Sequence, residues 1–290
     1  MKAVVVLVCT LIALNVSAQT DQEKALLEQQ DKLELILQLQ DRRTIHDGKL
    51  IHFLTDDNPL VRERAVRAYG SIQDTSILSL LVDRLTNDKP DVELSAAFAI
   101  GQTAGLLSKK SRETLQHDLI WARIDRTDAA DQLIEEIGKF GTEEALRDLV
   151  TRFGDISATP RTEALVMSIA RFAIRSVTAH EATEYILKLL KPPDRARWHA
   201  AYALQRIGDK KEVRASIDDV IQLYTNSHPL VRLNLATLLG KLKDERSSLE
   251  PLLKLAEFDA DWRVRVNALK ALANFDLNGK DEVLKLFRRS

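Results

Sequence analysis

The side chains that could carry chemistry in this chain are few and scattered. The nearest approach to a catalytic pattern is His180-Glu181, which begins the His-Glu-x-x-His spacing of zinc-binding helices. Glu184 stands where the second histidine is required, so His180 is expected to be a solvated residue at a helix start. Acidic pairs are frequent and are expected to lie on exposed helix faces; examples are Asp56-Asp57, Glu135-Glu136 and Asp218-Asp219.

Other catalytic and cofactor-binding patterns are absent from the sequence. There is no Gly-x-Ser-x-Gly nucleophile turn, no phosphate-binding Walker loop and no dinucleotide fingerprint. Six histidines and one cysteine leave little from which to build a metal site. We therefore expect no catalytic residue, no cofactor and no metal in this stretch, and a protein that is not an enzyme here.

The first residues predict a signal peptide at residues 1–18. Met1-Lys2 gives a positive start, Ala3 to Leu14 is almost wholly apolar, and Val16-Ser17-Ala18 supplies small residues at a cleavage site. The apolar run is shorter than the ~20 residues that span a bilayer, so no stable membrane insertion is expected after cleavage. Cys9 lies inside this run and is interpreted as an apolar signal residue, not a lipid site. The protein is thus predicted to be exported, either periplasmic or secreted.

The composition of the mature chain favours helices and weakens nucleic-acid binding as a function. Cleavage would remove the only cysteine, which excludes disulfides, and would remove Lys2, which changes the formal net charge from −1 to −2. A nucleic-acid binder would show a concentrated basic excess. With only 10 glycines, 7 prolines and 5% aromatic residues in 290, the sequence predicts an all-α fold.

An internal repeat organises the chain. Residues 58–72 align with residues 89–101, so that proline, valine, two alanines and glycine recur at an offset of 31 (92 − 61). Further copies begin near residues 194, 228 and 262, and a degraded one spans residues 160–174. Seven units of 31 to 37 residues account for residues 48–275. In the six units other than the degraded one, the glycine position of the repeat is occupied by Gly70, Gly101, Gly138, Gln205, Gly240 and Ala273.

Each unit is expected to form two helices. Apolar residues at helical spacing in residues 50–54 and 77–81 predict first helices, and a proline after each Asp/Asn-rich turn suits the start of the second helix. Gly70 is expected where neighbouring backbones crowd. One face of the second helix should form the core, with Val61, Ala65, Ala68, Tyr69 and Ile72.

On residues 56–62 with Ala65, Ala68 and Gly70, and on their copies, the sequence resembles the HEAT repeat family. It is most similar to short bacterial HEAT repeats of the phycobilin-lyase type, although a bilin-lyase-like activity would rest on that similarity alone. The resemblance implies a right-handed α-solenoid in which one arginine per unit bonds across the inter-repeat turn. These structural ladder residues would be Arg62, Arg197, Arg232 and Arg265, whereas the second unit has Glu93 at this place.

The two ends of the array suggest how it is bounded. A capping helix is expected over residues 19–47, beginning at the capping box Thr20 to Glu23, followed by a solenoid over residues 48–290. Residues 281–289 form either a makeshift cap or the first helix of an incomplete eighth unit. Residues 36–43 and 47–50 resemble exported cyclophilin-type peptidyl-prolyl isomerases that carry HEAT arrays. That resemblance implies an alternative function, the N-terminal recognition arm of a longer enzyme.

The outward face of the second helices is the candidate binding surface. Trp198, Tyr202 and Leu233 could form an apolar patch with His199 and Asn234 beside it, or these side chains could pack between repeats. Arg64 and Arg67 form a local basic cluster that suits either a phosphate or acidic partner or plain solvation. The sequence predicts a non-catalytic scaffold that binds a protein or peptide and no nucleic acid.

Overall fold

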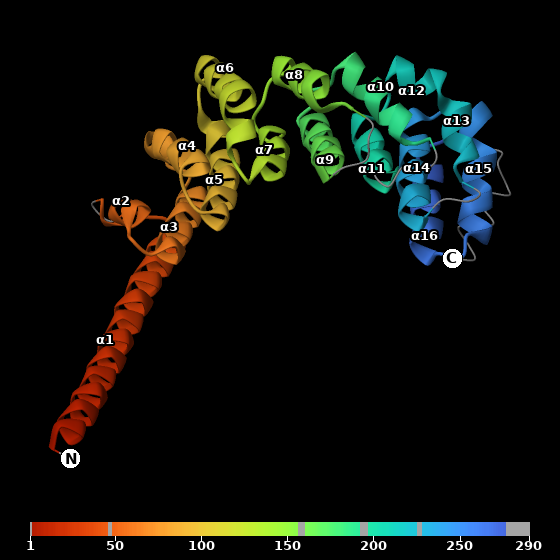
Figure 1. The fold of residues 1–290 in the computed structure, drawn as a ribbon. Helices are drawn as coiled ribbons and strands as arrows, with labels where there is room; N and C mark the ends of the chain where they lie inside the picture. Colours follow the sequence, from red (N-terminus) through yellow and green to blue (C-terminus); the bar gives the residue numbers. More distant parts are fainter. Residues whose placement is uncertain (1, 46–47, 156–159, 192–196, 225–227, 277–290) are drawn as a thin grey trace. The chain divides into compact units, whose positions relative to one another are not determined.

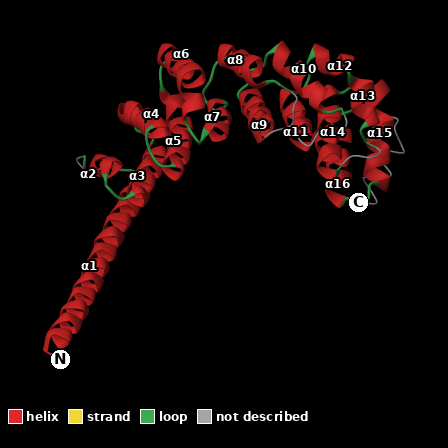
Figure 2. Cartoon of the chain, viewed as in Figure 1, coloured by secondary structure: helices red, strands yellow, loops and turns green. Residues whose placement is uncertain are grey.

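The structure, a computed structural model, describes residues 2–45, 48–155, 160–191, 197–224 and 228–276, with side chains from residue 22 onward. The chain divides into two compact units, residues 1–104 and residues 105–290. Within the described ranges every regular element is helical and no strand occurs (Figure 2). The prediction of an all-α solenoid is confirmed.

Unit 1 contains a long N-terminal helix and two helical pairs (Figure 1). Its elements are α1 (Lys2–Asp41), α2 (Lys49–His52) with the 3₁₀ turn η1 (Phe53–Thr55), α3 (Pro59–Ile72), the 3₁₀ turn η2 (Thr75–Ile77), α4 (Leu78–Thr86) and α5 (Pro90–Thr103). Helix α3 packs between α1 and α5, and α4 packs on α5. A further 3₁₀ turn, η3 (Ala104–Leu106), lies at the boundary of the unit.

Unit 2 contains five further helical pairs within its described residues. The first helices are α6 (Lys109–Asp118) with the turns η4 (Leu119–Arg123) and η5 (Ile124–Arg126), α8 (Glu143–Phe153), α10 (His180–Leu189), the broken pair α12 (Lys211–Ala215) and α13 (Ile217–Gln222), and α15 (Glu245–Phe258). The second helices are α7 (Ala130–Ile137), α9 (Pro160–Ile174), α11 (Arg197–Ile207), α14 (Pro229–Leu242) and α16 (Trp262–Leu272).

The helices of unit 2 form two rows (Figure 1). Each second helix packs on the second helix of the next pair, from α7 through α9, α11 and α14 to α16. The first helices follow one another in the other row. Because a single pair cannot bury its apolar side alone, this stacking creates the continuous core that a repeat protein needs.

The second helices start where the sequence predicts, for a local reason. Asn58 caps α3 by accepting a hydrogen bond from the Leu60 amide at 3.0 Å, and Pro59 occupies the first turn, where no amide proton is needed. Asp261 caps α16 in the same way through the Arg263 amide at 2.9 Å. These caps therefore fix the residue at which each of these second helices begins.

The predicted core positions are buried except for Ile72, which is half-buried, and the repeated glycines lie at helix crossings. Val61, Ala65 and Ala68 have no exposed surface. A Cβ atom placed on Gly70 would lie 2.9 Å from the Ala99 Cα, and one on Gly240 would lie 2.7 Å from the Ala271 Cα. Real Cβ contacts are longer, so glycine is what lets these second helices approach.

Helix α1 differs from the expected capping helix in its start. The described helix runs continuously from Lys2, so there is no break at Thr20 where the capping-box spacing predicted one. Threonine and the acidic residues after it tolerate a helix interior, and the apolar residues before them favour a helix. Ile36 and Leu39 are buried near the end of α1, where it packs on α3.

Two sequence predictions concern parts of the chain that the structure describes little or not at all. The side chains of the predicted signal peptide, Cys9 included, and residues 281–289 lie outside the described residues. Among the helices that are described, none combines the length and the apolar character needed to cross a membrane.

Candidate binding surface

The ladder arginine of unit 1 joins two successive turns. The Arg62 Nε donates to the Asp88 Oδ2 at 2.9 Å, in the turn before α5, while its Nη1 donates to the carbonyls of Asp56 and Asp57 in its own turn. The Asp88 side chain is only 1% exposed. Burial is the largest single influence and would raise the pKa of Asp88. The hydrogen bonds from Arg62 and the Lys89 amide, together with the charges of Arg62 and Arg84, outweigh it, so the pKa lies below its usual value.

In unit 2, Arg232 likewise bonds to an aspartate of the next turn. Its Nε and Nη2 donate to the two carboxylate oxygens of Asp259 at 2.6 and 2.8 Å, and the Asp259 side chain is 4% exposed. Arg265 donates from Nη1 to the carbonyls of Asp259 and Ala260, as Arg62 does to its own turn. The Arg197 Nε is buried without a hydrogen-bond partner among the described residues, and residues 225–227 of the following turn lie outside them.

Helix α1 supplies a lysine at the equivalent place, which the sequence analysis missed. The Lys32 Nζ donates to the Asp56 Oδ2 at 2.9 Å, and the Asp56 Oδ1 accepts from the Asn58 amide. Asp259 accepts from the Asp261 amide in the same way. Asp56 is therefore the turn aspartate of its unit, and α1 contacts it as a second helix would.

The solvent-facing residues of the last three second helices form one surface, which we call the binding face. Each helix contributes three residues spaced four apart, which is the spacing that places side chains on one side of a helix. The binding face consists of Trp198, Tyr202 and Arg206 on α11, Leu233, Thr237 and Lys241 on α14, and Val266, Lys270 and Asn274 at α16 and its end. Trp198, Tyr202 and Leu233 are the residues that the sequence analysis placed on this face, while Arg206, Lys241 and Asn274 lie one turn further along each helix.

The aromatic residues on α11 lie partly in solvent. Trp198 is 38% exposed, and its ring packs against that of His199 with the ring centroids 3.4 Å apart. Tyr202 is half-buried, and the Arg206 guanidinium lies over its ring, 5.0 Å from the centroid. Trp198, Tyr202 and Arg206 thus form a partly exposed strip with aromatic and cationic character along one helix.

Asn234 and the Nδ1 atom of His199, both predicted to lie beside the apolar patch, are buried instead. Asn234 is 8% exposed, and its side-chain amide donates to the Leu230 carbonyl of its own helix at 2.7 Å. The prediction that Asn234 lies on the surface is therefore wrong. One step along a helix rotates a side chain by about 100°, so Asn234 does not face the same way as Leu233. The His199 Nδ1 is buried and has no hydrogen-bond partner in the part of the chain that the structure describes, and burial lowers the pKa of His199.

The cations Arg206 and Lys241 were absent from the sequence-based surface. The Lys241 Nζ donates to the Gln205 carbonyl and, at 3.1 Å, to the Gln205 Oε1, so it joins α14 to α11. Partial burial and the nearby Arg206 charge lower the pKa of Lys241. The signal that could have found this row is the basic residue directly after the repeated glycine position in Gly138-Lys139, Gln205-Arg206 and Gly240-Lys241.

The basic cluster on α3 belongs to unit 1 and is partly neutralised. The Arg67 Nε pairs with the Glu63 Oε1 at 2.8 Å, and the Arg64 Nε lies 3.6 Å from the other oxygen of the same carboxylate. Arg67 also donates to the Ser95 hydroxyl of α5 at 3.3 Å. Glu63 therefore holds the two arginines within unit 1, whereas Trp198 and Tyr202 belong to unit 2.

His180 begins α10, as the sequence predicted, and pairs with a carboxylate. Its Nδ1 lies 2.7 Å from the Glu212 Oε1, and this hydrogen bond raises the pKa of His180. The part of the chain that the structure describes contains no group of three or more His, Cys, Asp or Glu residues arranged to hold a metal ion.

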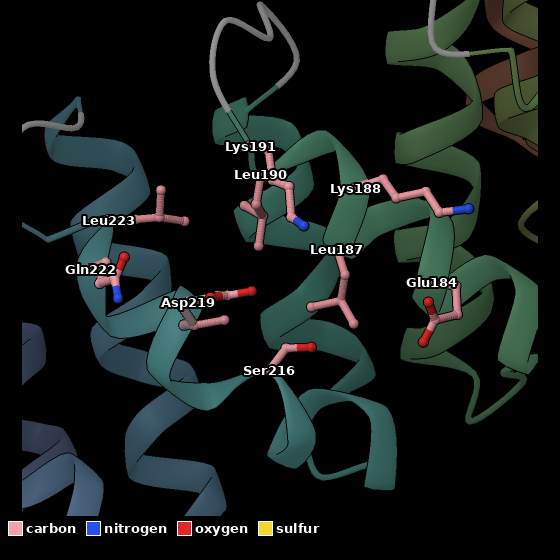
Figure 3. A pocket seen from close by; sticks show the side chains of 10 residues that line it. Glu184, Leu187, Lys188, Leu190, Lys191, Ser216, Asp219, Gln222 and Leu223 are labelled. Carbon is pink, nitrogen blue, oxygen red and sulfur yellow. The ribbon is translucent and has the colours of Figure 1, made fainter.

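A separate cavity of about 560 Å³ lies in the row of first helices (Figure 3). Leu187 and Leu190 from α10 and its end face Asp219 and Leu223 from α13 and its end across this space. Its lining mixes leucines with charged residues and holds none of the residues of the binding face. It is therefore separate from the binding face.

Comparison with known proteins identifies the repeat. The profile for HEAT repeats matches residues 48–133 and 217–290, which together make up more than half of the chain. The chain belongs to the HEAT repeat family. Helices α14 and α16 fall within the second matched segment, whereas α11 lies between the two segments. The HEAT repeat assignment therefore supports a scaffold built from helical pairs.

The solved structures similar to this HEAT repeat chain include designed and natural repeat proteins. A designed armadillo repeat protein in complex with the peptide (KR)4 is 20% identical, with a TM-score of 0.44, and the match covers 79% of this chain and 98% of that one. Kap121p is 16% identical, with a TM-score of 0.43, and the match covers 82% of this chain and 35% of that one. No curated protein matches the chain.

Proposed function

We propose that this protein is an exported, non-catalytic scaffold that binds a peptide or a protein segment through the binding face. The observation that carries the proposal is the partly exposed strip of Trp198, Tyr202 and Arg206 on α11, beside the half-buried Leu233 and Thr237 of α14. Aromatic and arginine side chains contribute most to protein interfaces, because they bury large areas and keep one polar group for a directed contact.

The geometry of the stacked helices also supports a peptide over a small molecule as ligand. Three neighbouring second helices each present three residues at the same positions, so the binding face is a shallow, repeated surface. Small-molecule sites are enclosed cavities with a few convergent polar groups. A chain segment can follow such a repeated surface from one helix to the next.

The binding test compares the mature chain, residues 19–290, with its Trp198→Ala/Tyr202→Ala variant as bait in the native envelope fraction. We expect a partner whose recovery falls at least 10-fold with the variant, because loss of two aromatic anchors typically costs 2 kcal/mol or more in affinity. Phe258→Ala is the matched control, since Phe258 is 74% exposed but lies at the end of α15, away from the binding face. Equal recovery by all three baits, each helical by circular dichroism, would contradict the proposed face.

Export rests on residues 1–18 and has its own test. We expect the mature chain to begin at Gln19 and to be lighter than the 32.7 kDa of the full chain, because Val16-Ser17-Ala18 offers a cleavage site. Ala18→Arg should block cleavage by removing the small residue, while Asp21→Arg, three positions further on, should leave it unchanged. Intact mass of the protein from the envelope of a bacterial host decides the matter, and an uncleaved chain in the cytoplasm would refute export.

A further inference from the structure

Charge is distributed unevenly along the second helices of unit 2. On α11, α14 and α16 the nine residues of the binding face include three cations, Arg206, Lys241 and Lys270, and no acidic residue. The residues at the same positions of the two preceding second helices include three acids and two cations: Asp131, Glu135 and Lys139 with α7, and Glu163, Met167 and Arg171 on α9. The formal charge therefore changes from −1 on the earlier helices to +3 on the binding face.

The cations of the earlier helices are already neutralised. The Arg171 Nη2 pairs with the Glu135 Oε2 at 2.9 Å, and Lys139 and Arg171 both lie against the carboxylate of Glu136, whose side chain is 1% exposed. In contrast, the Arg206 guanidinium lies over the Tyr202 ring, and the Lys241 ammonium donates to the neutral Gln205. Among the described residues, neither Arg206 nor Lys241 has a carboxylate partner.

We propose that the binding face recognises an acidic peptide segment in extended conformation, with carboxylates on Arg206 and Lys241 and an apolar side chain between Trp198 and Leu233. This proposal rests on the proposed function and specifies its ligand. Cations without a carboxylate partner are complementary to acidic side chains, and the neighbouring aromatic rings are complementary to apolar ones. A peptide that alternates acidic and apolar residues offers both. Of the two, the Arg206 guanidinium offers the bidentate geometry that suits a carboxylate.

The spacing of the helices sets the spacing of the acids. Packed helices lie roughly 8–10 Å apart, and an extended chain advances about 3.3–3.6 Å per residue. One helix step thus corresponds to about three peptide residues. Acidic residues at every third position should reach the cations of α11 and α14 in turn, whereas the same number of acids placed side by side should reach only one of them.

The test measures the fluorescence polarisation of labelled 12-residue peptides with the mature chain. The probes are (Glu-Ser-Phe)4, a peptide of identical composition with its four glutamates adjacent, and (Lys-Ser-Phe)4. We expect the first to bind at least 10-fold more tightly than the second and the third to bind weakest. Arg206→Gln/Lys241→Gln should weaken the first probe at least 10-fold, because it removes both carboxylate contacts.

The control removes the same charge elsewhere. Lys110→Gln/Lys254→Gln also lowers the net charge by two, but at exposed positions on α6 and α15, and it should change binding less than 2-fold. Equal weakening by both double variants, or equal affinity for the spaced and adjacent probes, would overturn the acidic-segment proposal. If (Lys-Ser-Phe)4 instead binds best and Trp198→Ala/Tyr202→Ala abolishes its binding, the acidic ligand is wrong while the proposed face stands.

Discussion

Arg232→Met is expected to lower the free energy of unfolding by about 3 kcal/mol, because removing one partner of a buried ion pair leaves the other charge uncompensated. The Asp259 side chain is 4% exposed and that of Arg232 is 15% exposed, so water compensates little for the loss. Methionine keeps most of the packing of the arginine stem. At about 2–4 °C per kcal/mol for a protein of this size, the melting temperature should fall by roughly 6–12 °C.

Arg263→Met is the matched control for this variant. Arg263 pairs with Asp261 at 2.7 Å, but its side chain is 48% exposed, so losing it should cost no more than about 1 kcal/mol. Equal melting temperatures for the two variants would contradict the ladder as a source of stability.

The same pair should make the repeat sensitive to acid. Burial raises the pKa of Asp259, but the hydrogen bonds from Arg232 and the Asp261 amide and the charge of Arg232 together lower it more, so the net direction is downward. The pair therefore contributes fully above the pKa of about 3.9 of an unfolded aspartate, and its contribution is lost as the pH falls through the lower folded value. The stability difference between the wild type and Arg232→Met should accordingly shrink below pH 4.

Gly240→Val is expected to destabilise unit 2 by about 3 kcal/mol. A Cβ atom at position 240 would lie 2.6 Å from the Ala271 Cβ and 2.7 Å from its Cα, so α14 and α16 must move apart. Overpacking of this kind costs about 1–3 kcal/mol, and the second branch of valine adds to the crowding. The gain in helix propensity over glycine is only about half a kcal/mol and does not offset it.

Gly105→Val provides the control, because a Cβ atom there would have no neighbour within 4 Å. Thermal unfolding followed by circular dichroism should show a fall of several degrees for Gly240→Val and little change for Gly105→Val. A Gly240→Val protein as stable as the wild type would show that the helices separate without cost, contrary to the close approach seen at Ala271.

The spacing of residues in the sequence predicts the core, and the reason is periodicity. Gly70 and Gly240 occupy one position of a repeat, and a small residue at a fixed position of stacked units implies a helix crossing. The partners of the ladder arginines were harder to predict. Arg62 bonds to Asp88, 26 residues on, and Arg232 to Asp259, 27 residues on, and the helical segments between them differ, since η2 and α4 span residues 75–86 and α15 spans residues 245–258.

The candidate surface was predicted in part, for a geometric reason. Trp198 and Tyr202 were placed outward by counting four residues along a helix, and both carry exposed surface. Asn234 was included because it is adjacent in sequence to Leu233, and adjacent residues face different directions on a helix. The cations at 206 and 241 were missed because the outward pattern was followed for two turns and the second helices continue for a third.

The central claim, that the binding face holds the partner, is tested most directly by site-specific photo-cross-linking in the native envelope fraction. Tyr202 and, separately, Leu187 are replaced by p-benzoylphenylalanine in the mature chain; Leu187 lines the cavity between α10 and α13. We predict a discrete cross-linked adduct from position 202, lost on competition with unlabelled wild-type protein, and none from position 187. An adduct from position 187 alone would move the binding site to the row of first helices and contradict the proposed face.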